Sequence, residues 1–312
     1  MNTFSEHDRN FINKKLISDC EVLMLTSNDW SNTGYRFMKC LELQKVNCIL
    51  IKLYKHIFNY PIQGVISNVE HTKVSRYPVV ININDDIFIE FIFNIAKKVK
   101  YIWCHASTIL LFKNKPIYEY EILKDKIYIV SHGGTTYREN PVMVGDIFNK
   151  FVCKTLIQCP DLLDLNKNNK QEELIYYPID LRTFTPDFSF KNETKLVFGH
   201  NPSTSKIKGS SVILDAIKLF EDNLIYIGQQ NEYKNHNEEI ERTDWNTQIL
   251  KYKKYDIYIE TINPSINNKP YGEWGNTCLE AIASGCIVIT NSIHLDKYIK
   301  LYQNIPPLFI AN

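Results

Sequence analysis

Short runs of apolar residues recur along this chain, and within each run the apolar positions are continuous instead of alternating with polar ones. Such runs predict strands that are buried on both faces. Between runs, apolar residues recur every three or four positions, as at Tyr35, Met38 and Leu41, which predicts helices. Another helix is expected to open at Asp85 and Asp86, because acidic residues suit a first turn. In the first half the predicted strands lie at residues 20–26, 47–53, 77–83, 100–107 and 126–134, with two more near 152–158 and 173–177.

The alternation restarts in the second half, after a segment without apolar periodicity. Residues 176–188, YYPIDLRTFTPDF, contain two prolines and predict a linker. Strands are then expected at 194–200, 223–229, 255–260 and 286–292, with helices at 209–220, near 244–253 and directly before the last strand. Buried strands interleaved with helices are typical of parallel sheets covered on both faces.

The pattern therefore predicts an α/β protein with two Rossmann-like domains whose parallel sheets face a central cleft. The N-terminal domain is expected over residues 1–178, the linker over 179–190 and the C-terminal domain over 191–312.

Net charge, cysteine spacing and the length of the apolar runs exclude several classes of protein. The chain has 312 residues, and its 36 basic and 35 acidic residues leave a net charge of +1, so no nucleic acid or anionic membrane is expected as a partner. Eight cysteines form no C-x-x-C pair, which predicts reduced thiols in a cytoplasmic protein and no zinc site. No apolar run approaches the ~18 residues of a membrane span, and the N-terminus lacks a signal-peptide core, so no integral membrane segment is expected.

Candidate chemistry should lie in the loops that follow strands, because parallel sheets bind ligands beyond their carboxyl ends. In SNDWSNTGYRF, Gly34 near a helix start would let backbone N–H groups approach a phosphate or a sugar. A tight structural turn explains this glycine equally well. In SHGGTTYREN, His132 precedes two glycines, where an imidazole could face a cleft or serve a structural role.

Two further loops carry charge in the second half. In GHNPSTSKIKGSS, Lys206 and Lys208 precede a predicted helix start at Gly209, which suits a diphosphate, although a solvated loop with incidental lysines is the alternative. In KPYGEWGNTCLEAIASGCIVITNS, the glycines would let the backbone approach a ligand, and Glu280 could accept hydrogen bonds from a vicinal diol. An ordinary surface helix with an exposed glutamate is the alternative there.

Three stretches together resemble the retaining GT-B glycosyltransferases, most closely the family 4 type. They are EELIYYPIDLRTFTPD at the interdomain segment, KLVFGHNPSTSKIKGSSVILDAI at the phosphate loop, and the diagnostic YDIYIETINPSINNKPYGEWGNTCLEAIASGCIVITNS. The resemblance implies a retaining, metal-independent hexosyltransferase that needs no cofactor. Its donor would be a UDP- or GDP-linked sugar, and its acceptor a glycan or glycoconjugate hydroxyl.

The resemblance also implies roles for individual residues. Glu280 would hold the donor ribose, and His132 would face the donor sugar as a catalytic residue together with Glu273. Lys208 and Lys206 would neutralise the diphosphate, with Gly34 beneath the phosphate or the acceptor. Backbone amides would face the sugar or the diphosphate at Gly275, Asn276 and Thr277.

The chain departs from the family pattern at three points. Six residues separate Glu273 from Glu280 where the family has seven, so either Glu273 substitutes after a local shift or the sugar-binding acid is absent. His200 or Asn201 stands where the family has an arginine, and the closing C-terminal helices are expected to be missing. A GT-B-fold sugar-nucleotide epimerase and a non-catalytic nucleotide-sugar or glycan-binding protein are therefore the alternatives.

Overall fold

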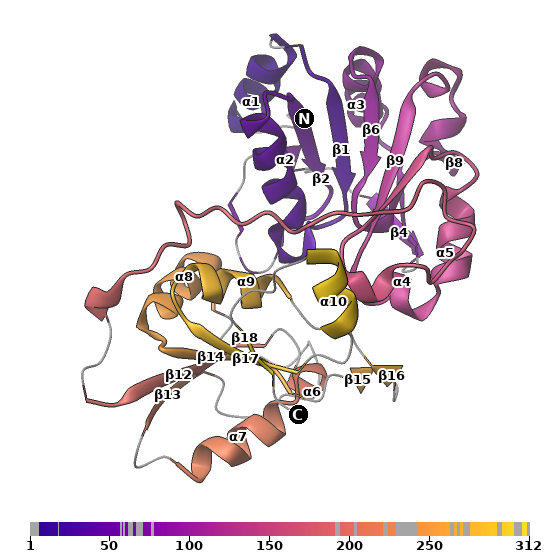
Figure 1. The fold of residues 1–312 in the computed structure, drawn as a ribbon. Helices are drawn as coiled ribbons and strands as arrows, with labels where there is room; N and C mark the ends of the chain where they lie inside the picture. The colour runs from indigo at the N-terminus through magenta and orange to yellow at the C-terminus, as the bar shows by residue number, and fades with distance from the viewer. Residues whose placement is uncertain are drawn as a thin grey trace. The chain divides into compact units, whose positions relative to one another are not determined.

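A computed structural model of the chain separates into two compact units, residues 1–178 and residues 179–312, and each is described by itself (Figure 1). The structure describes residues 6–17, 19–56, 58, 60–61, 65–66, 71–75, 78–190, 194–202, 205–220, 224–228, 243–262, 265–266, 269–270, 275–291, 295–302 and 308–310. Within these ranges no helix has both the length and the apolar character that crossing a membrane requires.

The first unit is built on a seven-stranded parallel sheet with the order β11-β10-β9-β6-β1-β2-β3. Its strands, in chain order, are β1 (Val22–Thr26), β2 (Cys48–Lys52), β3 (Val65–Ile66), β6 (Tyr101–Cys104), β9 (Ile127–His132), β10 (Lys154–Ile157) and β11 (Glu173–Leu174). All five residues of β1 and of β2 are buried, as the continuous apolar runs predict.

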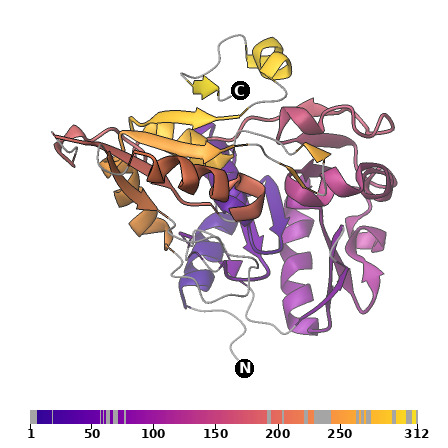
Figure 2. The ribbon, with the colours of Figure 1, turned by 90° about the horizontal axis from the view of Figure 1, so that it is seen from below.

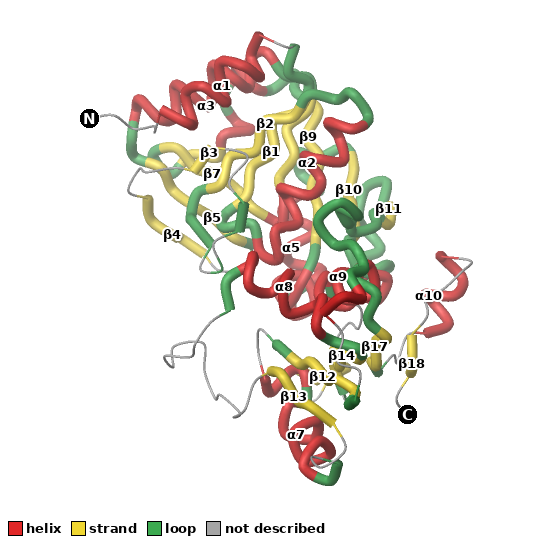
Figure 3. Tube along the Cα trace, turned by 90° about the vertical axis from the view of Figure 1, so that its left-hand side faces the viewer, coloured by secondary structure: helices red, strands yellow, loops and turns green. Residues whose placement is uncertain are grey.

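Helices cover both faces of this sheet (Figure 3). Alternate residues of a strand point to opposite faces, and Leu23 and Leu25 belong to one core cluster while Val22 and Met24 belong to another. Helices α1 (Glu6–Ile17) and α3 (Asp86–Lys98) contribute to the first cluster, and α2 (Thr33–Leu43) contributes Phe37 to the second. Helices α4 (Gly134–Glu139) and α5 (Pro141–Phe148) follow β9.

A second, four-stranded sheet in the first unit has the order β4-β5-β7-β8. Strand β5 (Val79–Ile83) pairs in parallel with β7 (Thr108–Phe112), flanked by β4 (His71–Ser75) and β8 (Lys115–Pro116). The predicted strand at 100–107 is therefore too long. It ends at Cys104, and the chain turns into the second sheet through Ala106 and Ser107, whose φ angles are positive at 51° and 55°.

The second unit is built on a five-stranded parallel sheet with the order β13-β12-β14-β17-β18. Figure 2 shows the ribbon from below, with the second half of the chain in brown, orange and yellow. Its strands are β12 (Leu196–His200), β13 (Leu224–Gly228), β14 (Ile257–Thr261), β17 (Ile287–Thr290) and β18 (Leu308–Ile310), and a two-stranded hairpin adds β15 (Ser265–Ile266) and β16 (Lys269–Pro270). Its helices are α6 (Ser205–Lys208), α7 (Ser210–Lys218), α8 (Trp245–Lys254), α9 (Asn276–Ala283) and α10 (Leu295–Tyr302).

Two segments of the second unit lie outside its central strands and helices. The segment predicted as a linker lies within this unit, and its Phe184 is buried in the core beside Tyr252. After β17 the chain forms α10, and β18 then pairs with β17 in parallel.

Candidate functional site

Three elements of the second unit converge at the carboxyl edge of its sheet. Glu260 is the fourth residue of β14, and its side chain is 1% exposed. Its Oε1 forms an ion pair with the Lys208 ammonium at the end of α6, and its Oε2 accepts a hydrogen bond of 2.5 Å from the Thr277 hydroxyl in the first turn of α9. The Glu260 carboxylate thereby contacts Lys208, which is 52 positions away in the chain, and Thr277, which is 17 positions away.

Glycines allow these elements to approach one another. Gly209 has a φ of +69°, and a Cβ there would lie 2.0 Å from the carbonyl oxygen of Ile262, while the Ile262 amide donates to the Lys208 carbonyl at 3.1 Å. Gly275 has an ordinary φ of −78°, but a Cβ there would lie 2.8 Å from Glu260 Oε1. The first glycine is required by both conformation and space, and the second by space alone.

The start of α9 lies beside the Lys208 ammonium. A Cβ at Gly275, the residue before the helix, would be 3.6 Å from Lys208 Nζ and 3.6 Å from Thr277 Oγ1. A helix N-terminus carries partial positive charge, and the ammonium beside it is paired with the Glu260 carboxylate. Lys208, Gly275 and Thr277, for which the family resemblance implies contacts with a nucleotide-sugar, therefore lie together at this end of the sheet.

Glu280 lies on α9 but is not the exposed surface glutamate of the alternative interpretation. Only 6% of the residue is exposed, and its Oε2 accepts a hydrogen bond of 3.1 Å from the hydroxyl of Tyr252, which is fully buried. Burial, and then the neighbouring Glu280, raises the pKa of Tyr252 well above its ordinary value. The phenol therefore stays protonated and holds one carboxylate oxygen in place.

Three other positions that the sequence analysis named lie in this unit, and they are His200, Lys206 and Glu273. His200 is buried, and burial lowers its pKa to about 4, so its imidazole is uncharged near pH 7. Its Nδ1 lies 2.8 Å from the Ile259 carbonyl, so Nδ1 donates and Nε2 accepts from the Ser210 hydroxyl at 2.8 Å. Lys206 lies on the short helix α6 and not in a loop, and Glu273 lies outside the described residues.

His132 is enclosed by its own unit, which fits the structural role that the sequence left open beside a cleft-facing one. It is the last residue of β9, and it is 0% exposed. Its ring stacks on Tyr137 with centroids 4.2 Å apart, and its Nδ1 lies 2.8 Å from the Ser107 hydroxyl. Burial lowers its pKa to about 3, which makes the imidazole neutral. The sequence places this histidine correctly at a strand end, but the packing of α4 over the ring encloses it.

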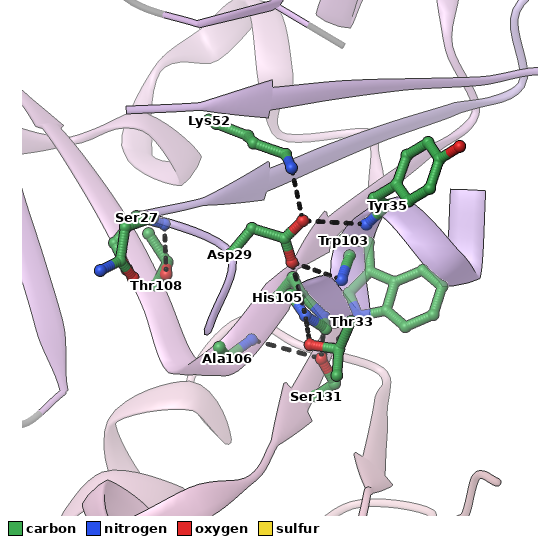
Figure 4. Close-up of polar contacts among 12 residues, drawn as sticks. Ser27, Asp29, Thr33, Tyr35, Lys52, Trp103, His105, Ala106, Thr108 and Ser131 are labelled. Atoms are coloured by element: carbon green, nitrogen blue, oxygen red, sulfur yellow. Dashed lines mark hydrogen bonds and ion pairs between the residues drawn. The ribbon is translucent and has the colours of Figure 1, made fainter. Parts of the chain in front are cut away.

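Gly34 is likewise used within its own unit. Its amide donates to Asp29 Oδ1 at 2.5 Å, and the amide of Tyr35 donates to Asp29 Oδ2 at 3.1 Å (Figure 4). Asp29 is fully buried and forms an ion pair of 2.7 Å with Lys52. The predicted phosphate contact of the Gly34 amide is therefore corrected, because an internal carboxylate already occupies the N-terminus of α2.

His105 extends this buried polar cluster (Figure 4). Ser131 Oγ accepts hydrogen bonds from Trp103 Nε1 at 2.9 Å and from the Ala106 amide at 3.4 Å, so its own proton points to His105 Nδ1 at 2.9 Å. His105 Nε2 then donates to Thr33 Oγ1 at 2.8 Å, and burial lowers the pKa of the ring to about 4.

Sequence reasoning missed four charged or titratable residues that organise these two clusters. All four lie at or just beyond the carboxyl ends of apolar strands, and that position in the pattern was the available signal. They are Asp29, Lys52, His105 and Glu260. No group of three or more His, Cys, Asp or Glu side chains suited to a metal ion occurs among the described residues.

Comparison with known proteins identifies the fold. No protein-family model and no curated protein matches the chain. Among solved structures, the chain is similar to HepE (Alr3699) of Anabaena in complex with UDP and glucose, with a TM-score of 0.52 and 10% identity over 88% of this chain and 81% of that one. The HepE complex with UDP matches with a TM-score of 0.53 and 10% identity, over 87% of this chain and 80% of that one. The HepE complex with UDP-glucose matches with a TM-score of 0.51 and 9% identity, over 86% of this chain and 79% of that one. The predicted GT-B fold, with its Rossmann-like α/β units and parallel sheets, is thereby confirmed.

Proposed function

We propose that this chain is a glycosyltransferase of the hexosyltransferase type, which moves a sugar from a nucleotide-diphosphate sugar to a hydroxyl group of a glycan or glycoconjugate. The donor diphosphate would lie against Lys208 and the start of α9. The ammonium and the helix N-terminus would supply the positive charge that the diphosphate needs, so the proposal includes no metal ion or cofactor.

The convergence of Lys208, Gly275 and Thr277 at one edge of a parallel sheet carries this proposal. Ligands of such sheets bind beyond the carboxyl ends of the strands, and a cation beside a helix N-terminus suits a diphosphate. HepE, which shares the fold, has been crystallised with UDP and with UDP-glucose, and this supports a UDP-linked donor.

In the proposed reaction the acceptor hydroxyl attacks the anomeric carbon from the face that the nucleotide leaves, so the anomeric configuration is retained. The bond from the anomeric carbon to the diphosphate breaks, a bond to the acceptor oxygen forms, and the acceptor proton passes to the leaving phosphate oxygen. Lys208 would stabilise the charge that develops on the diphosphate. Glu280 would hold the ribose, and Glu273 is the candidate for the sugar-binding acid. The buried His132 is given no part in this step.

Binding of nucleotide-sugars tests the proposal. A thermal-shift screen of UDP-, GDP- and ADP-sugars comes first, because a bound ligand stabilises the fold in proportion to its occupancy. Calorimetry with UDP-glucose should then show binding that Lys208→Ala weakens about tenfold or more, since a charge-assisted hydrogen bond contributes ~1.5–3 kcal/mol. Lys218→Ala is the matched control, because that lysine is 70% exposed on α7 and pairs with Asp215. The absence of binding to any nucleotide-sugar would refute the proposal.

A binding protein without turnover is the second candidate, and the complete burial of His132 favours it. Donor hydrolysis separates the two candidates. A glycosyltransferase should release UDP slowly from UDP-glucose without an acceptor and faster with a suitable glycan. A binding protein should hold the donor without releasing UDP under either condition. Release of an epimerised sugar would instead indicate an epimerase.

A further inference from the structure

We infer that Glu260 sets the charge selectivity of this site, so that the site favours a nucleotide-sugar over the more negatively charged free nucleoside diphosphate. The inference rests on the proposed function and concerns the same edge of the second sheet. It assigns a role to a carboxylate that has no part in the roles proposed above.

The position of Glu260 carries the inference. Its side chain is 1% exposed, and it contacts both the ammonium of Lys208, which is 13% exposed, and the hydroxyl of Thr277. A Cβ at Gly275 would lie closer to Glu260 Oε1, at 2.8 Å, than to Lys208 Nζ, at 3.6 Å. A negative charge thus lies directly beside the cation that would receive the diphosphate, and it reduces the net positive charge there.

A site with this balance should distinguish ligands by charge. A terminal phosphate with a second pKa near 6 carries close to two charges at neutral pH, so a free nucleoside diphosphate has about one negative charge more than its sugar ester. An ammonium and a helix N-terminus alone would favour the more charged species. A neighbouring carboxylate opposes that preference, because it repels the extra charge within a partly buried region where screening is weak. The expected consequence is easier release of the nucleotide product.

Glu260→Gln separates charge from geometry. The amide oxygen can still accept a hydrogen bond from Lys208, and the amide N–H can donate to Thr277 Oγ1, so the contacts have isosteric replacements. Only the negative charge is lost. Asp161→Asn is the matched control, because Asp161 is a buried carboxylate that pairs with Arg138 in the first unit at 2.5 and 2.9 Å.

Calorimetric titration with UDP and with UDP-glucose tests the inference. Glu260→Gln should bind UDP on the order of tenfold more tightly, because the variant no longer repels the diphosphate with a neighbouring negative charge. It should bind UDP-glucose more tightly by a smaller factor, because that ligand carries less negative charge. The ratio of the two dissociation constants should move toward UDP by about threefold or more. Asp161→Asn should leave both constants unchanged.

Two results would overturn the inference while leaving the proposed function in place. One is an unchanged ratio in Glu260→Gln, and the other is weaker binding of both ligands, which would make Glu260 only a support for Lys208. If Glu260→Gln does not fold, the double variant Glu260→Gln/Lys208→Met replaces the pair with neutral side chains. Its net charge matches the wild type, so its affinity ratio should stay within about threefold of the wild-type ratio, and a larger change would refute the inference. Wild-type protein that binds neither ligand would refute the proposed function itself.

Discussion

Replacing Asp29 with alanine should destabilise the first unit, because three groups depend on this one carboxylate. Lys52 Nζ lies 2.7 Å from Oδ2, and the amides of Gly34 and Tyr35 donate to the carboxylate at 2.5 and 3.1 Å. The Asp29 side chain is 0% exposed and that of Lys52 is 5% exposed, so water cannot replace the lost partner without a change in packing.

The magnitude follows from these contacts. Removing one partner of a buried ion pair costs ~3–5 kcal/mol, because it leaves an uncompensated charge, and losing a helix cap costs about 1 kcal/mol. The two terms share the same carboxylate, so we expect a total loss of roughly 3–5 kcal/mol in the free energy of unfolding of the first unit. The double variant Asp29→Ala/Lys52→Met removes the unpaired ammonium as well and should recover about half of that loss or more.

Hydrogen exchange measured peptide by peptide is the appropriate assay, because it separates the two units of the chain. Peptides from α2 and β2 should lose protection in Asp29→Ala, and peptides from α8 in the second unit serve as the internal reference. Glu121→Ala is the control variant. That glutamate is 82% exposed and pairs with Lys124, and an exposed pair contributes at most about 1 kcal/mol.

Two outcomes would refute this reasoning. The first is a change of less than about 1 kcal/mol in the protection of α2, which would mean that the Asp29 contacts contribute no more than a surface pair. The second is a double variant that is as unstable as Asp29→Ala. In that case the cost would come from lost packing around the carboxylate and not from the unpaired charge on Lys52.

Two further predictions concern Gly209, which follows α6, and the buried histidines. Gly209→Ala should lower the free energy of unfolding by about 2 kcal/mol or more and should weaken UDP binding. The reason is that the φ angle of Gly209 is +69° and that a Cβ there would lie 2.0 Å from the Ile262 carbonyl oxygen. An unchanged melting temperature and an unchanged affinity in calorimetry would contradict this prediction. Burial lowers the pKa of His105 and His200 to about 4 and of His132 to about 3, from an ordinary 6.5. Below pH 6.5 the unfolded chain therefore binds more protons than the folded chain. The free energy of unfolding should be highest above that pH and should fall as the pH drops toward 4, by up to about 1.4 kcal/mol per pH unit for each histidine. Urea unfolding at pH 7 and pH 5 measures this slope, and equal midpoints would contradict it.

The sequence by itself determined the fold class, because the signals for it are local. Largely apolar runs such as CILIK in β2 and IYIET in β14 are strands of parallel sheets, as the pattern of apolar positions predicted. The helix predicted to open at the acidic pair begins at Asp86, and the side chain of Asp85 caps it by accepting from the Phe88 amide at 2.7 Å. Periodicity and capping depend on neighbours within a few residues, so they can be read from the chain.

Only the tertiary structure decided which strands share a sheet. The runs at 77–83 and 100–107 are both predicted as strands, yet β5 joins the four-stranded sheet and β6 joins the seven-stranded one. The division depends on positive φ angles at Ala106 and Ser107 and on the pairing of β5 with β7, which are 25 or more residues apart in the chain. Neither feature leaves a periodic signal.

The same division applies to the candidate site. Family resemblance pointed to Lys208 and Thr277, but the carboxylate that joins them was found only in the structure, because Glu260 is 52 residues from Lys208. Its charge inside an apolar strand signalled an unusual position and could not identify its partners. The position of His132 at a strand end suggested a reactive group. In the folded chain its imidazole is buried, because Tyr137 stacks on the ring. Burial and partner choice are set by contacts between distant segments, and for that reason only the folded chain reveals them.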